Sequence, residues 1–157
     1  MTIFNIVRAF EKAEERGYKQ VYFMIDLHNT IIPSSPDKEH NNTAFYSLAK
    51  EVLQNMTKNP RIVMILWTST YPEHLKSVLE WLKQHGIEFK YVNENPDFKS
   101  TELNDYSVKP AFDVLLDNCA GFAGDNDWYW VKNELIKAGE WVYPSKTDIK
   151  LTDSTRL

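Results

Sequence analysis

The chain has 157 residues, with 18 lysines and arginines against 22 aspartates and glutamates, so its formal net charge is −4. This length suits one globular domain with a sizeable core, and 43% hydrophobic and 13% aromatic residues exclude intrinsic disorder. The mildly acidic balance argues against broad electrostatic capture of nucleic acid or anionic membranes.

Helical periodicity and unbroken apolar runs alternate along the first half of the chain. A helix is expected over residues 3–16, and the apolar run Val21–Ile25 predicts a strand covered on both faces. Residues 27–41 are polar and contain prolines, so they predict a loop. A second helix is expected over residues 42–56, followed by a second buried strand over residues 61–67.

The alternation continues in the second half. Thr70 and the glutamate three residues later have the spacing of a capping box, which predicts the start of a helix that stops at Gly86. The other expected elements are strands over 89–92 and 112–117, a helix over 127–138 and an edge strand over 141–143. This pattern predicts an α/β fold, a Rossmann-like three-layer α/β/α domain over residues 1–143 with a mainly parallel central sheet. A polar C-terminal tail, residues 144–157, would follow it.

Polar side chains lie next to the predicted strands, and ligands of open parallel sheets bind outside the carboxyl ends of the strands. The candidates are Asp26, His28 and Thr30 after the first strand, Thr68 and Ser69 after the second, Asp117 and Asn118 after the last, and Lys109 shortly before it. Each of these residues alone also fits a turn, a helix cap or a solvated lysine. Their order and spacing together predict that acids, hydroxyls and an amine converge at one edge of the sheet.

This combination resembles the haloacid dehalogenase superfamily of phosphotransferases. The four motifs of that superfamily are an apolar strand followed by Asp-x-Asp-x-Thr, an apolar strand ending in Thr or Ser, a lysine, and an apolar strand ending in acids. Over about residues 18–138 the chain has, in the same order, Phe-Met-Ile-Asp26-Leu-His28-Asn-Thr30, Met-Ile-Leu-Trp-Thr68-Ser69, Lys109, and Asp-Val-Leu-Leu-Asp117-Asn118. The segments where the superfamily inserts cap domains are short here, which indicates a small capless phosphatase-like member.

The resemblance implies a Mg²⁺-dependent phosphomonoester hydrolase in which Asp26 attacks phosphorus and becomes an aspartyl phosphate. A carboxylate attacks a phosphate dianion only where their charges are offset. The implied substrate-binding residues, two of them also catalytic, are Thr30, Thr68, Ser69 and Lys109. The implied ligands of Mg²⁺ are Asp26, the backbone carbonyl of His28, Asp117 and Asn118.

His28 departs from the superfamily pattern. Hydrolytic members usually carry aspartate at this place, which protonates the leaving group and then activates water. Imidazole can do the same acid–base work, with an unperturbed pKa of about 6.5. Two interpretations therefore stay open: a hydrolase with a shifted pH profile, or a catalytically idle domain that binds a phosphorylated ligand or a protein partner. A histidine that only fills the position is the structural alternative.

The expected partner is a phosphorylated small molecule or an exposed phosphoester, because no cap would cover the site. Nucleic acid is not expected from the charge, and no apolar stretch reaches the roughly 20 residues that cross a membrane. Cys119 is the one cysteine, so no internal disulfide can form and a cytoplasmic location is expected. Trp128, Tyr129 and Trp130 could serve a homodimer contact, although packing of at least two of them beneath the last helix is the simpler expectation.

Overall fold

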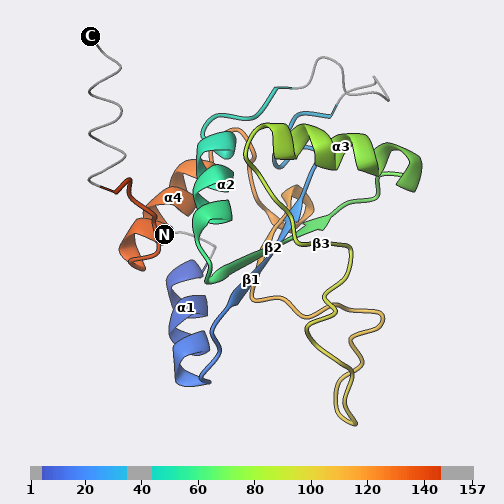
Figure 1. Ribbon diagram of the computed structural model, residues 1–157, viewed down its shortest axis with the longest axis vertical. Coiled ribbons are helices and arrows are strands. Elements are labelled where there is room, and N and C mark those ends of the chain that lie inside the picture. Colours follow the sequence, from blue (N-terminus) through green and yellow to red (C-terminus); the bar gives the residue numbers. More distant parts are fainter. Residues whose placement is uncertain (1–4, 35–43, 146–157) are drawn as a thin grey trace.

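The computed structural model describes residues 5–34 and 44–145 (Figure 1). The expected helix residues before position 5, those at positions 42 and 43, and the tail from position 146 lie outside the described residues. The helices are α1 (Ile6–Glu15), α2 (Ala49–Lys58), α3 (Pro72–Gln84), the short 3₁₀ helix η1 (Asn118–Ala120) and α4 (Trp128–Lys137). The strands are β1 (Val21–Asp26), β2 (Ile62–Trp67), β3 (Tyr91–Val92) and β4 (Val114–Leu116). No helix in the described ranges is long and apolar enough to cross a membrane.

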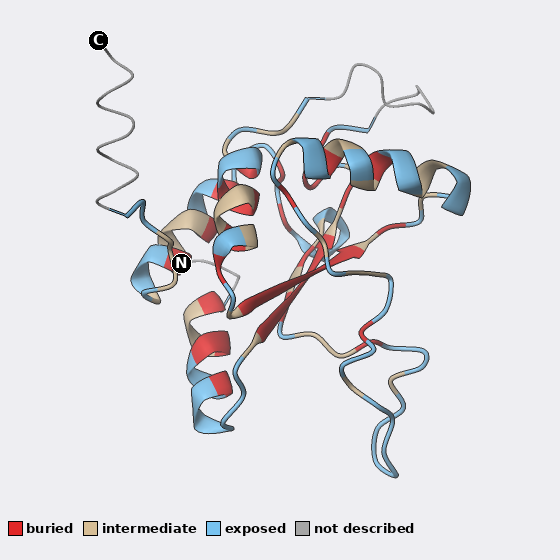
Figure 2. Ribbon diagram, viewed as in Figure 1, coloured by how far each residue is buried: buried red, intermediate tan, exposed pale blue. Residues whose placement is uncertain are grey.

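The four strands form one sheet in the order β3-β2-β1-β4, and every neighbouring pair is parallel. The six residues of β1 pair along their whole length with the six residues of β2. Both strands are buried except for their last residue, as Figure 2 shows in red, which is why their sequences are unbroken apolar runs. The expected parallel α/β fold is confirmed.

The two faces of the sheet are covered differently. Successive strand residues point to opposite faces, so Phe23 and Ile25 of β1 join a core to which all four α-helices contribute. Tyr22 and Met24 point to the other face, where Phe98 packs from the segment between β3 and β4. In Figure 1, α1, α2 and α4 lie together, whereas this segment extends away from them. In the described ranges this irregular segment covers the face of the sheet that carries Tyr22 and Met24.

The second helix begins later than its periodicity predicts. It was expected from residue 42, but α2 starts at Ala49, directly after Leu48 in the left-handed conformation with φ of +65°. Phe45 and Leu48 still pack against the main core, from the stretch before the helix. The helical spacing of these apolar residues therefore predicts their burial correctly, but it does not predict the conformation of the backbone.

The expected edge strand over residues 141–143 is absent from the described part of the chain. Instead, the backbone of Val142 is held by the side chain of Asn55 in α2. Asn55 Nδ2 donates to the Val142 carbonyl at 2.7 Å, and the Val142 N–H donates to Asn55 Oδ1 at 2.9 Å. A side-chain amide thus satisfies the backbone groups that a sheet would otherwise pair.

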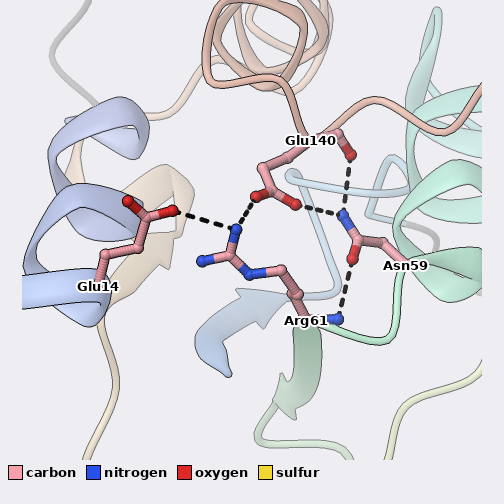
Figure 3. A network of polar contacts seen from close by, with 4 residues as sticks. All are labelled: Glu14, Asn59, Arg61 and Glu140. Carbon is pink, nitrogen blue, oxygen red and sulfur yellow. Dashed lines mark hydrogen bonds and ion pairs between the residues drawn. The ribbon is translucent and has the colours of Figure 1, made fainter. Parts of the chain in front are cut away.

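A polar network joins α1, the start of β2 and the segment after α4 (Figure 3). The Arg61 guanidinium pairs with the Glu140 carboxylate, lies 3.5 Å from Glu14 Oε1 and stands over the ring of Phe10 at 5.4 Å. The buried Asn59 donates from Nδ2 to the backbone carbonyl of Glu140 at 2.9 Å and to its carboxylate at 3.0 Å. Asn59 Oδ1 accepts the N–H of Arg61 at 2.9 Å. Three elements far apart in sequence are therefore held by one set of side chains.

We expect Glu140→Gln to lower the free energy of unfolding by about 2 kcal/mol, because the Arg61 guanidinium would lose the nearer and more buried of its two acidic partners. The Glu140 side chain is 9% exposed. The matched control is Glu11→Gln, whose side chain is 56% exposed and pairs with Arg8, so it should cost less than about 0.5 kcal/mol. Urea denaturation measures both variants, and equal losses would contradict a special role for the network.

Candidate functional site

The carboxyl edge of the sheet brings three of the candidate side chains together. Asp26 ends the central strand β1 and lies abreast of Trp67, the last residue of β2. On the other side, Ile25 pairs with Leu116, so Asp117 lies level with Asp26 on the neighbouring strand. Thr68 follows Trp67 directly. Asp26 therefore stands between a threonine on one side and a second acid on the other.

The Asp26 carboxylate is held by a hydrogen bond from the turn that follows β1. Thr30 Oγ1 donates to Asp26 Oδ2 at 2.9 Å and accepts the backbone N–H of Asn118 at 3.0 Å. The indole Nε1 of Trp128 donates to the backbone carbonyl of Thr30 at 2.8 Å. Both Thr30 and Trp128 have no exposed surface. The nucleophile candidate is thus positioned by a chain of contacts that reaches the start of α4.

A tight turn after β1 places His28 beside this site. The carbonyl of Leu27 accepts the N–H of Ile31 at 2.9 Å, and Asn29 has a positive φ of 61°, which asparagine tolerates better than most residues. Gly124 packs under the turn so closely that an added Cβ would come within 2.8 Å of the Asn29 carbonyl. His28 is partly buried and stands two residues after the end of β1.

Asn118 connects the two acids. In the amide orientation that satisfies hydrogen bonding, its Nδ2 donates to Asp26 Oδ2 at 2.9 Å and to Asp117 Oδ1 at 3.3 Å. The same Asp117 oxygen accepts the N–H of Cys119 at 2.8 Å. The pKa of Asp26 is raised to about 6, mainly by burial and to a smaller extent by the negative charge of Asp117, while the hydrogen bond from Thr30 opposes the rise.

The chemistry of this donor set fits Mg²⁺. The pair of acids favours added positive charge, since the negative charge of Asp117 disfavours ionisation of Asp26. Rotation of the Asn118 amide would turn Oδ1 toward both carboxylates and give three oxygens, the ligand type that Mg²⁺ prefers. The described residues contain no group of three or more His, Cys, Asp and Glu side chains suited to a metal. Water or substrate oxygens would therefore complete the coordination.

A residue that the sequence analysis missed holds the loop after β2. Asn93 follows β3 with a φ of +56°, accepts the N–H of Thr68 at 2.8 Å through Oδ1 and donates to its carbonyl at 2.8 Å through Nδ2. The hydroxyl groups of Thr68 and Thr70 are 2.8 Å apart. Thr68 is buried and Ser69 is exposed. An asparagine after a short strand signals a turn, but nothing in its sequence position signals these contacts.

Lys109 lies apart from the other candidates, so its expected convergence with them is wrong. It lines a cavity of about 460 Å³ together with Arg16 and Tyr18, two residues that precede β1. Residues before a parallel strand lie at the amino edge of the sheet, and Lys109 precedes β4. The five steps from Val21 to Asp26 span about 16 Å at about 3.3 Å per step, so Asp26 and this cavity are at opposite ends of β1.

The aromatic run at the start of α4 is divided between the core and the surface. Trp128 is fully buried, and its ring meets Phe122 edge to face at 5.1 Å. Tyr129 and Trp130 remain 52% and 46% exposed. The expectation that at least two of these three residues pack beneath the helix is therefore wrong. The sequence did not distinguish the tryptophan that supports Thr30 from its neighbours.

The raised pKa of Asp26 predicts how stability depends on pH. The folded value, about 6, lies above the unfolded value of about 3.9, so the folded state binds more protons between them. The free energy of unfolding should therefore fall as the pH rises from about 4 to 6. We expect Asp26→Asn to be more stable than the native chain at pH 7 by about 1 kcal/mol, after allowance for solvent screening of the half-buried carboxyl. Urea denaturation at pH 4 and pH 7 tests this.

Two outcomes of that experiment are informative. The gain from Asp26→Asn should shrink at pH 4, where the native carboxyl is already protonated. The matched control is Asp125→Asn, at an exposed position, which should change stability little at either pH. A gain that is the same at both pH values would contradict the titration argument.

Comparison with known proteins gives a fold. No protein-family model matches the chain, and no curated protein matches it. A solved structure of a conserved protein from Bacteroides thetaiotaomicron is similar, with 23% sequence identity and a TM-score of 0.56. The match covers 83% of this chain and 97% of that one. At this identity the likeness extends to the parallel α/β fold and no further.

Proposed function

We propose that the chain is a Mg²⁺-dependent phosphomonoester hydrolase of the haloacid dehalogenase type, with Asp26 as its nucleophile. One observation carries the proposal: a half-buried carboxylate at the end of the central strand, set between Asp117 and Thr68 and bonded to Thr30. This is where ligands of open parallel sheets bind. The substrate class is a phosphorylated small molecule or an exposed phosphoester.

In the proposed reaction, the Asp26 oxygen forms a bond to phosphorus while the bond from phosphorus to the leaving oxygen breaks. His28 gives that oxygen a proton, then accepts one from a water that attacks the phosphoenzyme and releases inorganic phosphate. The hydroxyl of Thr68 would donate to a phosphate oxygen, and Thr30 keeps the carboxylate in place. Bound Mg²⁺, held by Asp26, Asp117 and Asn118, would supply positive charge that offsets the negative charges of the Asp26 carboxylate and of the phosphate.

A second candidate is a catalytically idle domain that binds a phosphorylated ligand or a protein partner. Two observations favour it. Lys109, the cation that the mechanism would use, lines a cavity at the other edge of the sheet. His28 also stands where hydrolytic members usually carry an acid. Binding without turnover would then depend on Asp26, Asp117 and Thr68.

The deciding experiment is phosphate release from an aryl phosphate between about pH 5 and 9, with Mg²⁺ or with a chelator. We expect Mg²⁺-dependent turnover in the native chain, and a displaced pH profile in His28→Asp because the two acid–base groups differ in pKa. A silent native chain with an active His28→Asp variant would favour the idle domain. Silence of both, together with no Mg²⁺ binding by calorimetry, would overturn both forms of the proposal.

A further inference from the structure

The cavity that contains Lys109 takes no part in the proposed reaction. It lies between the approach to β1, with Arg16 and Tyr18, and the segment before β4, with Tyr106 and Lys109. Its volume of about 460 Å³ is within the range of small-molecule sites, about 300–1,000 Å³. The cavity is at the amino edge of the sheet, so a ligand there would not touch Asp26.

One wall of the cavity is a cluster of aromatic rings centred on Phe98. The ring of Tyr22 meets it edge to face at 5.2 Å, Tyr106 at 6.0 Å and Tyr18 at 6.5 Å. Tyr18 is half exposed, so its ring is open to solvent at the edge of the cluster. A planar ring can add to such an arrangement by stacking or by an edge-to-face contact.

The lining of the cavity carries two acids and two cations. Two acids line the cavity, but their carboxylates are engaged: Asp113 Oδ2 accepts the N–H of Tyr22 at 2.8 Å, and Asp105 Oδ1 accepts the N–H and the hydroxyl of Ser107 at 3.0 and 2.5 Å. Arg16 and Lys109 make no ion pair with another described residue. Arg16 and Lys109 are therefore the groups of the lining that can form an ion pair with an anion, and the charge of Arg16 also acts on the Asp113 carboxyl.

The segment that builds the cavity is long, without secondary structure of its own, and held in place by specific contacts. The buried Asn95 donates to the carbonyl of Ala111 at 2.7 Å. Asp97 accepts the hydroxyl of Tyr91 and, at 2.7 Å, that of Tyr22, and these two hydrogen bonds keep its pKa below the usual range. Ordered segments of this length usually serve binding or catalysis. These contacts therefore fix the conformation of the segment, and the cavity is formed before any ligand binds.

We infer that this cavity binds a small molecule in which a planar heteroaromatic ring is joined to a phosphate group, as in a nucleoside monophosphate. The ring would pack against Phe98 and Tyr18, and the phosphate would be held by Arg16 and Lys109, since arginine and lysine are the side chains that best bind phosphate. A nucleic acid would present the same chemistry, but the net charge of −4 disfavours a long polyanion.

The test is calorimetric titration of adenosine 5′-monophosphate into the Asp26→Asn chain in the presence of a chelator. These conditions remove the proposed reaction, so the result does not depend on whether the chain is a hydrolase. We expect the nucleotide to bind at least about fivefold more tightly than adenosine or ribose 5-phosphate, because each of these offers only half of the contacts. Equal binding of ribose 5-phosphate would overturn the role of the aromatic wall.

Matched variants locate the site. The double variant Arg16→Gln/Lys109→Gln should weaken binding by about fivefold or more. The control is the double variant Lys12→Gln/Lys137→Gln, which changes the net charge by the same amount at the ends of two helices and should leave binding unchanged. Phe98→Leu should weaken binding of the nucleotide but not of ribose 5-phosphate. No binding of the nucleotide, or equal losses in both charge pairs, would overturn the inference. Tighter binding of an oligonucleotide with a steep salt dependence would overturn it in favour of nucleic acid.

Discussion

Asp26→Asn should reduce phosphate release by roughly 10³-fold or more, because the amide cannot form the bond to phosphorus that the carboxylate forms. The substitution keeps the shape of the side chain, and its amide oxygen can still accept the hydrogen bond from Thr30. Loss of activity would therefore reflect lost chemistry and not a disordered site. Steady-state assays with Mg²⁺, with acid-quenched protein examined for covalent phosphate, measure the effect.

Asp113→Asn is the matched control for that experiment. Asp113 precedes β4 at the amino edge and accepts the N–H of Tyr22, so the same substitution there leaves the carboxyl edge untouched. It should keep activity within about twofold of the native chain, because surface and distant changes rarely affect a site they do not touch. Full activity in Asp26→Asn, or equal losses in both variants, would exclude Asp26 as the nucleophile.

Trp128→Ala should lower the free energy of unfolding by about 3–5 kcal/mol, the usual cost of removing a fully buried large aromatic side chain. Trp128→Phe keeps much of the ring but removes the Nε1 donor, so the buried carbonyl of Thr30 would lose its partner. That variant should cost about 1–3 kcal/mol. Urea denaturation gives both values.

The adjacent Trp130 supplies the control. It is 46% exposed, so Trp130→Ala should cost less than about 1 kcal/mol. Activity would distinguish the role of Trp128 in core packing from its role in positioning Thr30. Trp128→Phe should lose more activity than its loss of folded protein explains, because Thr30 holds Asp26. Equal destabilisation by Trp128→Ala and Trp130→Ala would contradict the packing argument.

The strands of the sheet were predictable because both sides of each central strand are buried. Residues Val21–Ile25 and Ile62–Trp67 are therefore continuously apolar, and the structure places β1 and β2 there. The start of α2 was not predictable, because Phe45 and Leu48 are apolar for packing against the core while the backbone at Leu48 is left-handed.

The site was predictable in part, for a related reason. The ends of parallel strands meet at one edge, so Asp26, Thr68 and Asp117 come together as expected. The same rule places Lys109 at the opposite edge, because it precedes its strand. Contacts such as that between Asn59 and Glu140 join residues 81 positions apart, and no local pattern specifies such pairs.

The lengths of the strands have a consequence for aggregation. The two edge strands have two and three residues, whereas the two central strands have six each. Short edges offer few free backbone groups to another chain, and they shelter two apolar segments of the kind that forms cross-β fibrils. Variants that release β1 or β2 should therefore aggregate on heating before they can refold, and their stability is best measured in urea at low protein concentration.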